Sequence, residues 1–203
     1  MRLRRLERHH APELREIRRR QGRRFLRRQR GHHINSAVVY DACGGSVTSD
    51  EALYDPCDPA ITFTTGMFSW PNYAGTINDS HFVSRDRVSR SLAFVARATE
   101  ESVTTGGAAW GVGVDDGGSL FIDKNGLATA PGADTFVVLG DRRPEQADPD
   151  RYLTYDDYRI WRLRLGGTYD FKNRPTCGYY LRSVVDGIPD RDLRNGTPVT
   201  NCG

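Results

Sequence analysis

Short apolar runs alternate with polar, turn-forming segments along most of the chain, which is the pattern of a mixed α/β domain. The clearest helix is predicted at residues 85–99, because Val88, Leu92 and Val95 fall at the i, i+4 and i+7 positions of one helical face. A shorter helix is predicted at residues 46–53, where Ser and Thr precede acidic residues as in an N-cap. Strands are predicted from the other apolar runs, at residues 36–40, 61–68, 75–78, 108–114, 119–122, 135–139 and 158–165.

Two of the strand predictions carry more specific expectations. Asn125-Gly126 predicts a hairpin turn between the strands at 119–122 and 135–139. Residues 158–165 alternate apolar and basic side chains, which is typical of a half-exposed or edge strand. Strand–helix–strand alternation followed by a strand-rich end therefore predicts an α/β sheet with antiparallel additions near the C-terminus.

Charge is divided unevenly along the chain. Residues 1–30 contain 13 Arg and 3 Glu, whereas the remaining residues hold 16 Lys and Arg against 23 Asp and Glu. We therefore divide the chain into an Arg-rich arm, residues 1–33, and an α/β domain, residues 34–203. The arm has too few apolar residues to build a core, so we expect it to be disordered or partly helical. Two alternatives remain open. The arm could bind nucleic acid or acidic surfaces, or it could be a segment that does not belong to the domain and that results from a misassigned start of the chain.

Hydropathy excludes some classes of protein. No run approaches 18 consecutive apolar residues, so we expect no membrane span, and no apolar run follows the basic N-terminus as in an intact signal peptide. Nothing in the sequence indicates a cofactor, and the cysteine spacings do not form the pairs typical of a zinc site. Nucleic acid is not the expected partner, because Phe25 is the one aromatic residue of the basic arm, and assembly into a homodimer stays open.

His81 is the one histidine inside the predicted domain, and it lies between the strand at 75–78 and the helix at 85–99. An α/β enzyme places a general base at such a strand end, although a capping or packing histidine is the alternative. Arg85, Arg87 and Arg90 follow it closely. Guanidinium groups beside a histidine suit recognition of a carboxylate, whereas a solvated helix face is the plainer explanation.

These residues lie within a segment that resembles a known family. The segment reads DSHFVSRDRVSRSLAFVAR, and it is similar to the Asp-Gln-His-Phe…Arg-x-Arg-x-x-Arg segment of cyanophycinases, a family of serine peptidases. Three further strings resemble the family in the same order along the chain: SVTSDEAL, WGVGVDDGGSLFIDKNGLATAPGADTFVVLG and LTYDDYRIWRLRLGGTYDF. The resemblance extends from Ser36 to Phe171.

The resemblance implies a fold, an activity and a set of site residues. The fold is a three-layer α/β sheet with flanking helices, of the class I glutamine amidotransferase-like or flavodoxin-like type. The activity is hydrolysis of β-aspartyl-arginine or other acidic peptides by a Ser–His–acid triad. His81 corresponds to the base and Glu51 to the acid, with Asp50 as the alternative. The implied substrate-binding residues are Asp79, Arg85, Arg87 and Arg90.

The nucleophile of the family is not matched. A Gly-x-Ser-x-Gly string does not occur in the chain, and Ser36 is the nearest candidate. Val38 stands where the family has the glycine that permits a tight elbow. We therefore expect the N-terminal part of the family domain to be truncated and the chain to be inactive as written. The alternative function is that of a non-catalytic binding protein whose basic arm contacts nucleic acid or acidic partners.

The chain contains four cysteines, and whether they form disulfides depends on the cellular compartment. They are Cys43, Cys57, Cys177 and Cys202. Four cysteines allow three pairings, and the two local loops, 43–57 and 177–202, are natural disulfides. We expect at least one of them to form, Cys43–Cys57 first. Disulfides favour an extracellular over a cytoplasmic protein.

Overall fold

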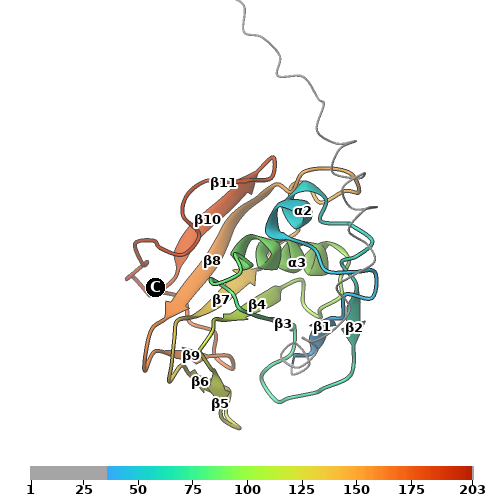
Figure 1. Cartoon of the computed structure of the whole chain (residues 1–203). Helices are drawn as coiled ribbons and strands as arrows, with labels where there is room; N and C mark the ends of the chain where they lie inside the picture. Colours follow the sequence, from blue (N-terminus) through green and yellow to red (C-terminus); the bar gives the residue numbers. More distant parts are fainter. Residues whose placement is uncertain (1–35, 203) are drawn as a thin grey trace, which may run out of the picture. The chain divides into compact units, whose positions relative to one another are not determined.

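An eight-stranded sheet runs through residues 36–202, the part of the chain that this computed structural model describes (Figure 1). The strand order is β11-β10-β8-β7-β4-β3-β1-β2. The strands are Val38–Tyr40 (β1), Phe63–Thr65 (β2), Thr76–Ser80 (β3), Ala109–Val114 (β4), Thr135–Gly140 (β7), Tyr155–Leu163 (β8), Tyr180–Val185 (β10) and Ile188–Pro189 (β11). The predicted arm, residues 1–33, lies outside the described residues.

Parallel and antiparallel pairing divide the sheet. Strands β1, β3 and β4 are parallel neighbours, whereas β7, β8, β10 and β11 continue the sheet in antiparallel fashion. The domain is therefore mixed α/β, with the antiparallel additions that the sequence predicted.

A three-stranded sheet with the order β5-β6-β9 accompanies the large one. Its strands are Phe121–Ile122 (β5), Leu127–Thr129 (β6) and Thr168–Asp170 (β9). The Asn125-Gly126 turn joins β5 to β6, so the predicted hairpin exists but its second strand was misplaced. The short strand β6 escaped prediction because only two of its residues are apolar.

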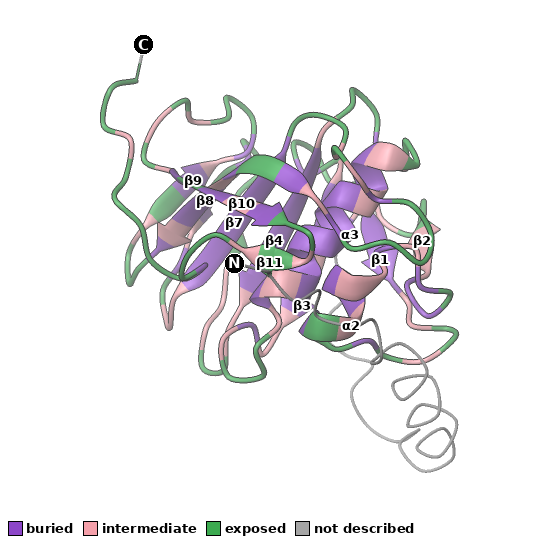
Figure 2. Cartoon of the chain, turned by 90° about the horizontal axis from the view of Figure 1, so that it is seen from above, coloured by how far each residue is buried: buried purple, intermediate pink, exposed green. Residues whose placement is uncertain are grey.

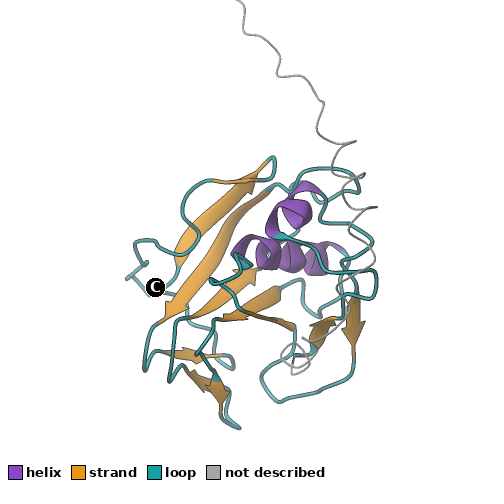
Figure 3. Cartoon of the chain, in the orientation of Figure 1, coloured by secondary structure: helices purple, strands orange, loops and turns teal. Residues whose placement is uncertain are grey.

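Two helices, Ser49–Tyr54 (α2) and Val88–Glu100 (α3), pack against each other on the large sheet (Figure 3). The predicted apolar face of α3 is buried, since Val88, Leu92 and Val95 are at most 2% exposed. Helix α3 connects the parallel strands β3 and β4, as a crossover helix does. Neither helix has the length and apolar character needed to cross a membrane.

Most residues of the central strands are buried (Figure 2), and the two faces of the large sheet belong to two separate cores. Because side chains alternate along a strand, Phe136 and Val138 of β7 pack with the helices, whereas Val137 and Leu139 pack on the opposite face. Ala128 of β6 and Tyr169 of β9 belong to this second core. The small sheet therefore covers the face that the helices leave open.

Residues 158–165 were predicted to form a half-exposed or edge strand. The edge alternative was wrong, because β8 lies between β7 and β10, whereas the half-exposed one is confirmed for Arg159 and Arg162, whose side chains are 41% and 28% exposed. The basic residues suggested an edge, but their side chains lie partly exposed along the surface of an internal strand and pair with acidic residues there. Arg159 pairs with Asp141 at 3.0 Å, and Nε of Arg162 donates to Asp134 at 2.6 Å. Long basic side chains can follow a sheet surface while their charged ends find partners.

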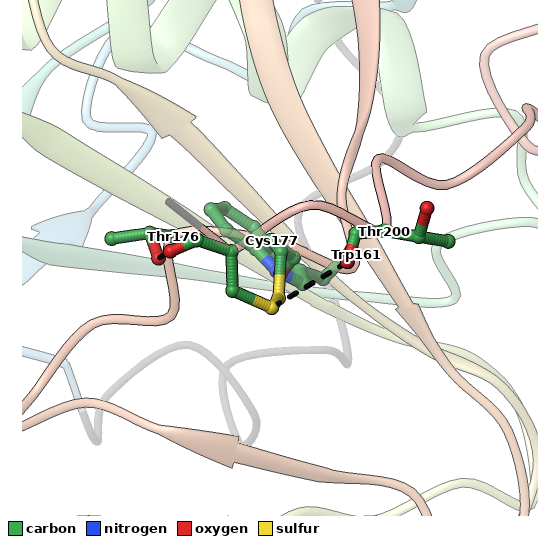
Figure 4. Close-up of a disulfide and its surroundings, with 5 residues drawn as sticks. Trp161, Thr176, Cys177 and Thr200 are labelled. Atoms are coloured by element: carbon green, nitrogen blue, oxygen red, sulfur yellow. Dashed lines mark hydrogen bonds between the residues drawn. A yellow bond between two sulfur atoms is a disulfide. The ribbon is translucent and has the colours of Figure 1, made fainter.

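The C-terminal segment is held by a disulfide between Cys177 and Cys202 (Figure 4). Nε1 of Trp161 donates to the carbonyl of Cys177 at 2.8 Å, and Oγ1 of Thr176 donates to the carbonyl of Cys202 at 2.8 Å. One local disulfide therefore forms, as expected. The preference for Cys43–Cys57 was wrong, because both of those cysteines are thiols.

Candidate functional site

His81 follows β3 directly, at the carboxyl end of a strand that is parallel to its neighbour β4. Ser80 is level with Val114 in this pairing, so the residues after both strands emerge at the same edge of the sheet. His81 has a positive φ of 52°, which is unusual for a residue with a side chain. This conformation directs the chain away from the strand into the turn that leads to α3.

The carboxylate that meets His81 is that of Asp116. Its Oδ1 contacts Nδ1 of the imidazole, and the side chains are 21% and 61% exposed for His81 and Asp116. Sequence reasoning missed this residue. The available signal was the Asp115-Asp116-Gly117-Gly118 turn directly after an apolar strand, because parallel pairing brings the ends of neighbouring strands together.

Phe82 anchors the chain next to His81. Its side chain is completely buried and packs against Phe136, with ring centroids 5.6 Å apart. It also lies flat on Gly113 of β4, where a Cβ atom would come within 2.3 Å of the Phe82 ring. Glycine at 113 is therefore required for this packing, which holds His81 at the surface beside a rigid neighbour.

Asp79 and Arg90, two of the predicted substrate-binding residues, bind each other. Nε of Arg90 donates to Oδ2 of Asp79 at 2.6 Å, and Nη2 donates to Oδ1 at 2.7 Å. Nη1 of Arg90 donates to the carbonyl of Val47 at 3.0 Å. All three guanidinium nitrogens of Arg90 thus have partners inside the domain, so this pair joins α3 to β3 beside the His81 turn.

Arg85 and Arg87 line a cavity of about 370 Å³ beside the His81 turn. Nη1 of Arg87 donates to the carbonyl of Ser80 at 2.9 Å, which ties the cavity to the residue preceding His81. Partial burial, followed by the nearby charge of Arg90, lowers the pKa of the Arg87 guanidinium. The other lining residues are Ser46, Val47, Thr48, Ser49, Asp50, Asp86 and Arg90.

Glu51, the acid predicted for His81, caps α2. Its Oε2 accepts from the backbone N–H of Thr48 at 2.9 Å and from the Thr48 hydroxyl at 3.0 Å. Together with the reciprocal bond from the Glu51 N–H to Thr48 Oγ1, these contacts form a capping box. The alternative acid, Asp50, lines the cavity. The structure therefore gives the partner role to Asp116 and a helix-capping role to Glu51.

Ser36, the candidate nucleophile, lies at the opposite end of the sheet from His81. Strand β1 is parallel to β3 with Val38 opposite Ile77, so Ser36 is level with Gly75, six residues before His81. At about 3.3 Å per strand residue the separation along the sheet is roughly 20 Å. The side chain is fully buried and donates to the carbonyl of Val38 at 2.6 Å. The prediction that Ser36 is the nucleophile of this site was therefore wrong.

A second cavity, of about 470 Å³, also borders the His81 region. Val83 and Asp115 contribute to its lining, together with Arg194 and Asn195 from the segment that the disulfide holds. Within residues 36–202, no group of three or more His, Cys, Asp or Glu side chains is arranged to hold a metal ion.

Comparison with known proteins gives no further assignment: no family model matches the chain, and a search of curated proteins finds no match.

Proposed function

We propose that the chain is a cyanophycinase-like, serine-type hydrolase homologue that binds β-aspartyl or other acidic peptides. The observation that carries this proposal is the contact between Nδ1 of His81 and the Asp116 carboxylate at the carboxyl end of β3. The parallel strands β1, β3 and β4, with α3 as the crossover, support the finer assignment to the class I glutamine amidotransferase-like fold, although in residues 36–202 the small sheet, not helices, covers the second face.

The contact between Asp116 and His81 suits a general base. A carboxylate that accepts a hydrogen bond from Nδ1–H fixes the tautomer of the ring, and the proton-accepting nitrogen is then Nε2. In a Ser–His–acid triad this nitrogen takes the proton of the nucleophile. In this proposal His81 is the base and Asp116 is the residue that orients it.

The arginine-lined cavity suits the acidic part of a peptide. Arg85 and Arg87 bring positive charge to the cavity beside the His81 turn, whose lining also includes Asp50 and Asp86. Guanidinium groups bind carboxylates through charge-assisted hydrogen bonds. Because Ser36 lies at the other end of the sheet, we expect the chain to bind such peptides without hydrolysing them.

The test of hydrolysis uses the full chain with β-aspartyl-arginine and with cyanophycin, beside a His81→Ala variant. We expect no turnover above buffer in either protein, because loss of a triad nucleophile removes nearly all of the rate advantage, a factor of about a million. Turnover that is abolished in His81→Ala would show that another hydroxyl acts as the nucleophile.

The test of binding is calorimetric titration of the same peptide into wild type, Arg87→Gln and Arg143→Gln. Arg143 is a matched control, because it is an exposed arginine that pairs with Glu100. We expect Arg87→Gln to weaken binding by about tenfold or more, as expected for loss of a charged hydrogen bond, and Arg143→Gln to bind like wild type. Equal affinities in all three proteins would show that the peptide does not bind through Arg87, and would contradict the proposed role of the cavity.

A further inference from the structure

Two adjacent carboxylates after β4 contact the His81 turn at different points. Asp116 reaches the imidazole, whereas Oδ1 of Asp115 accepts hydrogen bonds from the backbone N–H of Val83 at 3.1 Å and of Ser84 at 2.9 Å. The turn that carries both acids is closed by a bond from the N–H of Gly118 to the carbonyl of Asp115 at 2.9 Å. One hydrogen-bonded turn thus contacts both the ring and the backbone that follows it.

The backbone after His81 needs such support. His81 and Asp86 both have positive φ angles, 52° and 49°, a conformation that residues with side chains rarely adopt. The N–H of Arg85 bonds to the carbonyl of His81 at 3.0 Å, and the N–H of Arg87 bonds to that of Phe82 at 2.8 Å. A segment that turns this sharply keeps its shape only when the surrounding structure holds it.

Asp115 is suited to this task because its carboxylate stays ionised. Partial burial, the largest single influence, raises its pKa, but the hydrogen bonds from Ser84, from the Asp116 N–H and from Val83 outweigh it and lower the pKa below the usual aspartate value. An ionised carboxylate accepts stronger hydrogen bonds from backbone N–H groups than a neutral acceptor does.

We propose that Asp115 is a positioning residue for His81, which holds the 82–84 backbone so that the imidazole faces Asp116. The functional meaning of this role rests on the proposed function, in which His81 is the base. The geometric claim is independent of it, because the orientation of the ring can be measured without a substrate.

The experiment compares the full chain with Asp115→Ala, Asp115→Asn and Asp123→Ala by nitrogen-15 NMR. Asp123 is a matched control, because its Oδ1 accepts from the backbone N–H of Asn125 at 2.8 Å and of Leu127 at 3.0 Å in the β5–β6 hairpin. The first readout is the tautomer of the His81 ring, whose signals are identified by their loss in His81→Ala. The second readout is hydrogen exchange at the amides of Val83 and Ser84.

We expect the His81 ring of wild type to be held as the Nδ1–H tautomer. In Asp115→Ala it should shift toward the Nε2–H form, and exchange at Val83 and Ser84 should rise about tenfold or more, since a charged acceptor is lost. Asp115→Asn retains an acceptor oxygen and should restore most of the wild-type tautomer. Asp123→Ala should leave the His81 signals unchanged.

An unchanged His81 tautomer in Asp115→Ala would overturn the proposal, and so would an equal shift in Asp123→Ala. If Asp115→Ala fails to fold, Asp115→Glu supplies the comparison, because it displaces the carboxylate by one methylene group; an unchanged tautomer would again overturn the proposal. Failure of wild type to bind β-aspartyl-arginine would refute the proposed function alone, because the tautomer comparison uses no ligand.

Discussion

Arg90 binds Asp79 at two points inside the domain, with Nε 2.6 Å from Oδ2 and Nη2 2.7 Å from Oδ1. The side chains are 3% and 2% exposed, so the pair is almost completely removed from water. Arg90 belongs to α3 and Asp79 to β3, the strand that ends directly before His81. The pair therefore joins the helix to the strand that carries the candidate base.

Removing one partner of this pair should destabilise the domain strongly. We expect Arg90→Met to lower the free energy of unfolding by about 3–5 kcal/mol, because the buried Asp79 carboxylate would lose both of its hydrogen bonds from Arg90 and keep the longer one from Arg87 at 3.4 Å. The measurement is urea unfolding. A second substitution, Asp79→Leu in the Arg90→Met background, should recover part of the loss, because it removes the buried carboxylate that Arg90 no longer pairs with.

The surface pair of Arg143 and Glu100 is the control for this prediction. Their side chains are 74% and 34% exposed, so Arg143→Met should change the free energy of unfolding by less than about 1 kcal/mol. A similar loss in Arg90→Met and Arg143→Met would contradict the structural importance of the buried pair.

The disulfide supports the C-terminal segment and one wall of the second cavity. The N–H of Gly178 bonds to the carbonyl of Val199 at 2.7 Å, inside the loop that Cys177 and Cys202 close. For a loop with a sequence separation of 25, the chain-entropy model gives a stabilisation of about 3.5 kcal/mol. We expect Cys177→Ser with Cys202→Ser to lose a comparable amount in urea unfolding, whereas Cys43→Ser should change little.

Thiol counting tests the same assignment chemically. The unfolded, unreduced protein should react as two thiols, those of Cys43 and Cys57. Four reactive thiols after exposure to air would argue against the disulfide. Two reactive thiols in a Cys43→Ser, Cys57→Ser variant would place them at 177 and 202 and contradict the pairing.

Asp41 should make stability depend on acid pH. Its partial burial, the largest single influence, raises the pKa, but hydrogen bonds from Thr62, Thr64 and Cys43 outweigh it and lower the pKa from 3.8 to about 2. Because the folded pKa is the lower one, Asp41 stabilises the fold fully above the unfolded pKa, and this contribution disappears as pH falls from about 4 to about 2. Urea unfolding across this range should show a steeper loss for wild type than for Asp41→Asn. Parallel curves for the two proteins would contradict the prediction.

Local patterns were sufficient to predict the elements whose apolar residues all face one core. The helix at 85–99 is an example, because Val88, Leu92 and Val95 are buried on one side of α3. Strand β8 shows the limit of such patterns. The environment of Arg159 and Arg162 depends on Asp141 and Asp134, which lie in other parts of the chain, and a local alternation of apolar and basic residues does not reveal them.

The candidate site was predictable only in part for a similar reason. The place of His81 follows from the order of a strand and a helix along the chain. The contact of His81 with Asp116 depends on the pairing of β3 with β4, and the spacing of residues along the sequence does not reveal that pairing. Glu51 was preferred by family resemblance, yet its spacing from Thr48 also satisfies a capping box, and that local interaction is the one the structure contains.

The central claim, that an acidic peptide binds beside His81, is tested most directly by titrating β-aspartyl-arginine into the nitrogen-15 labelled full chain. The account predicts saturable shifts of the amide signals of residues 46–50, 85–87 and 90, which line the cavity next to the His81 turn, and a loss of these shifts in Arg87→Gln. No saturable shift at millimolar peptide, or saturable shifts confined to residues outside the cavity, would contradict it.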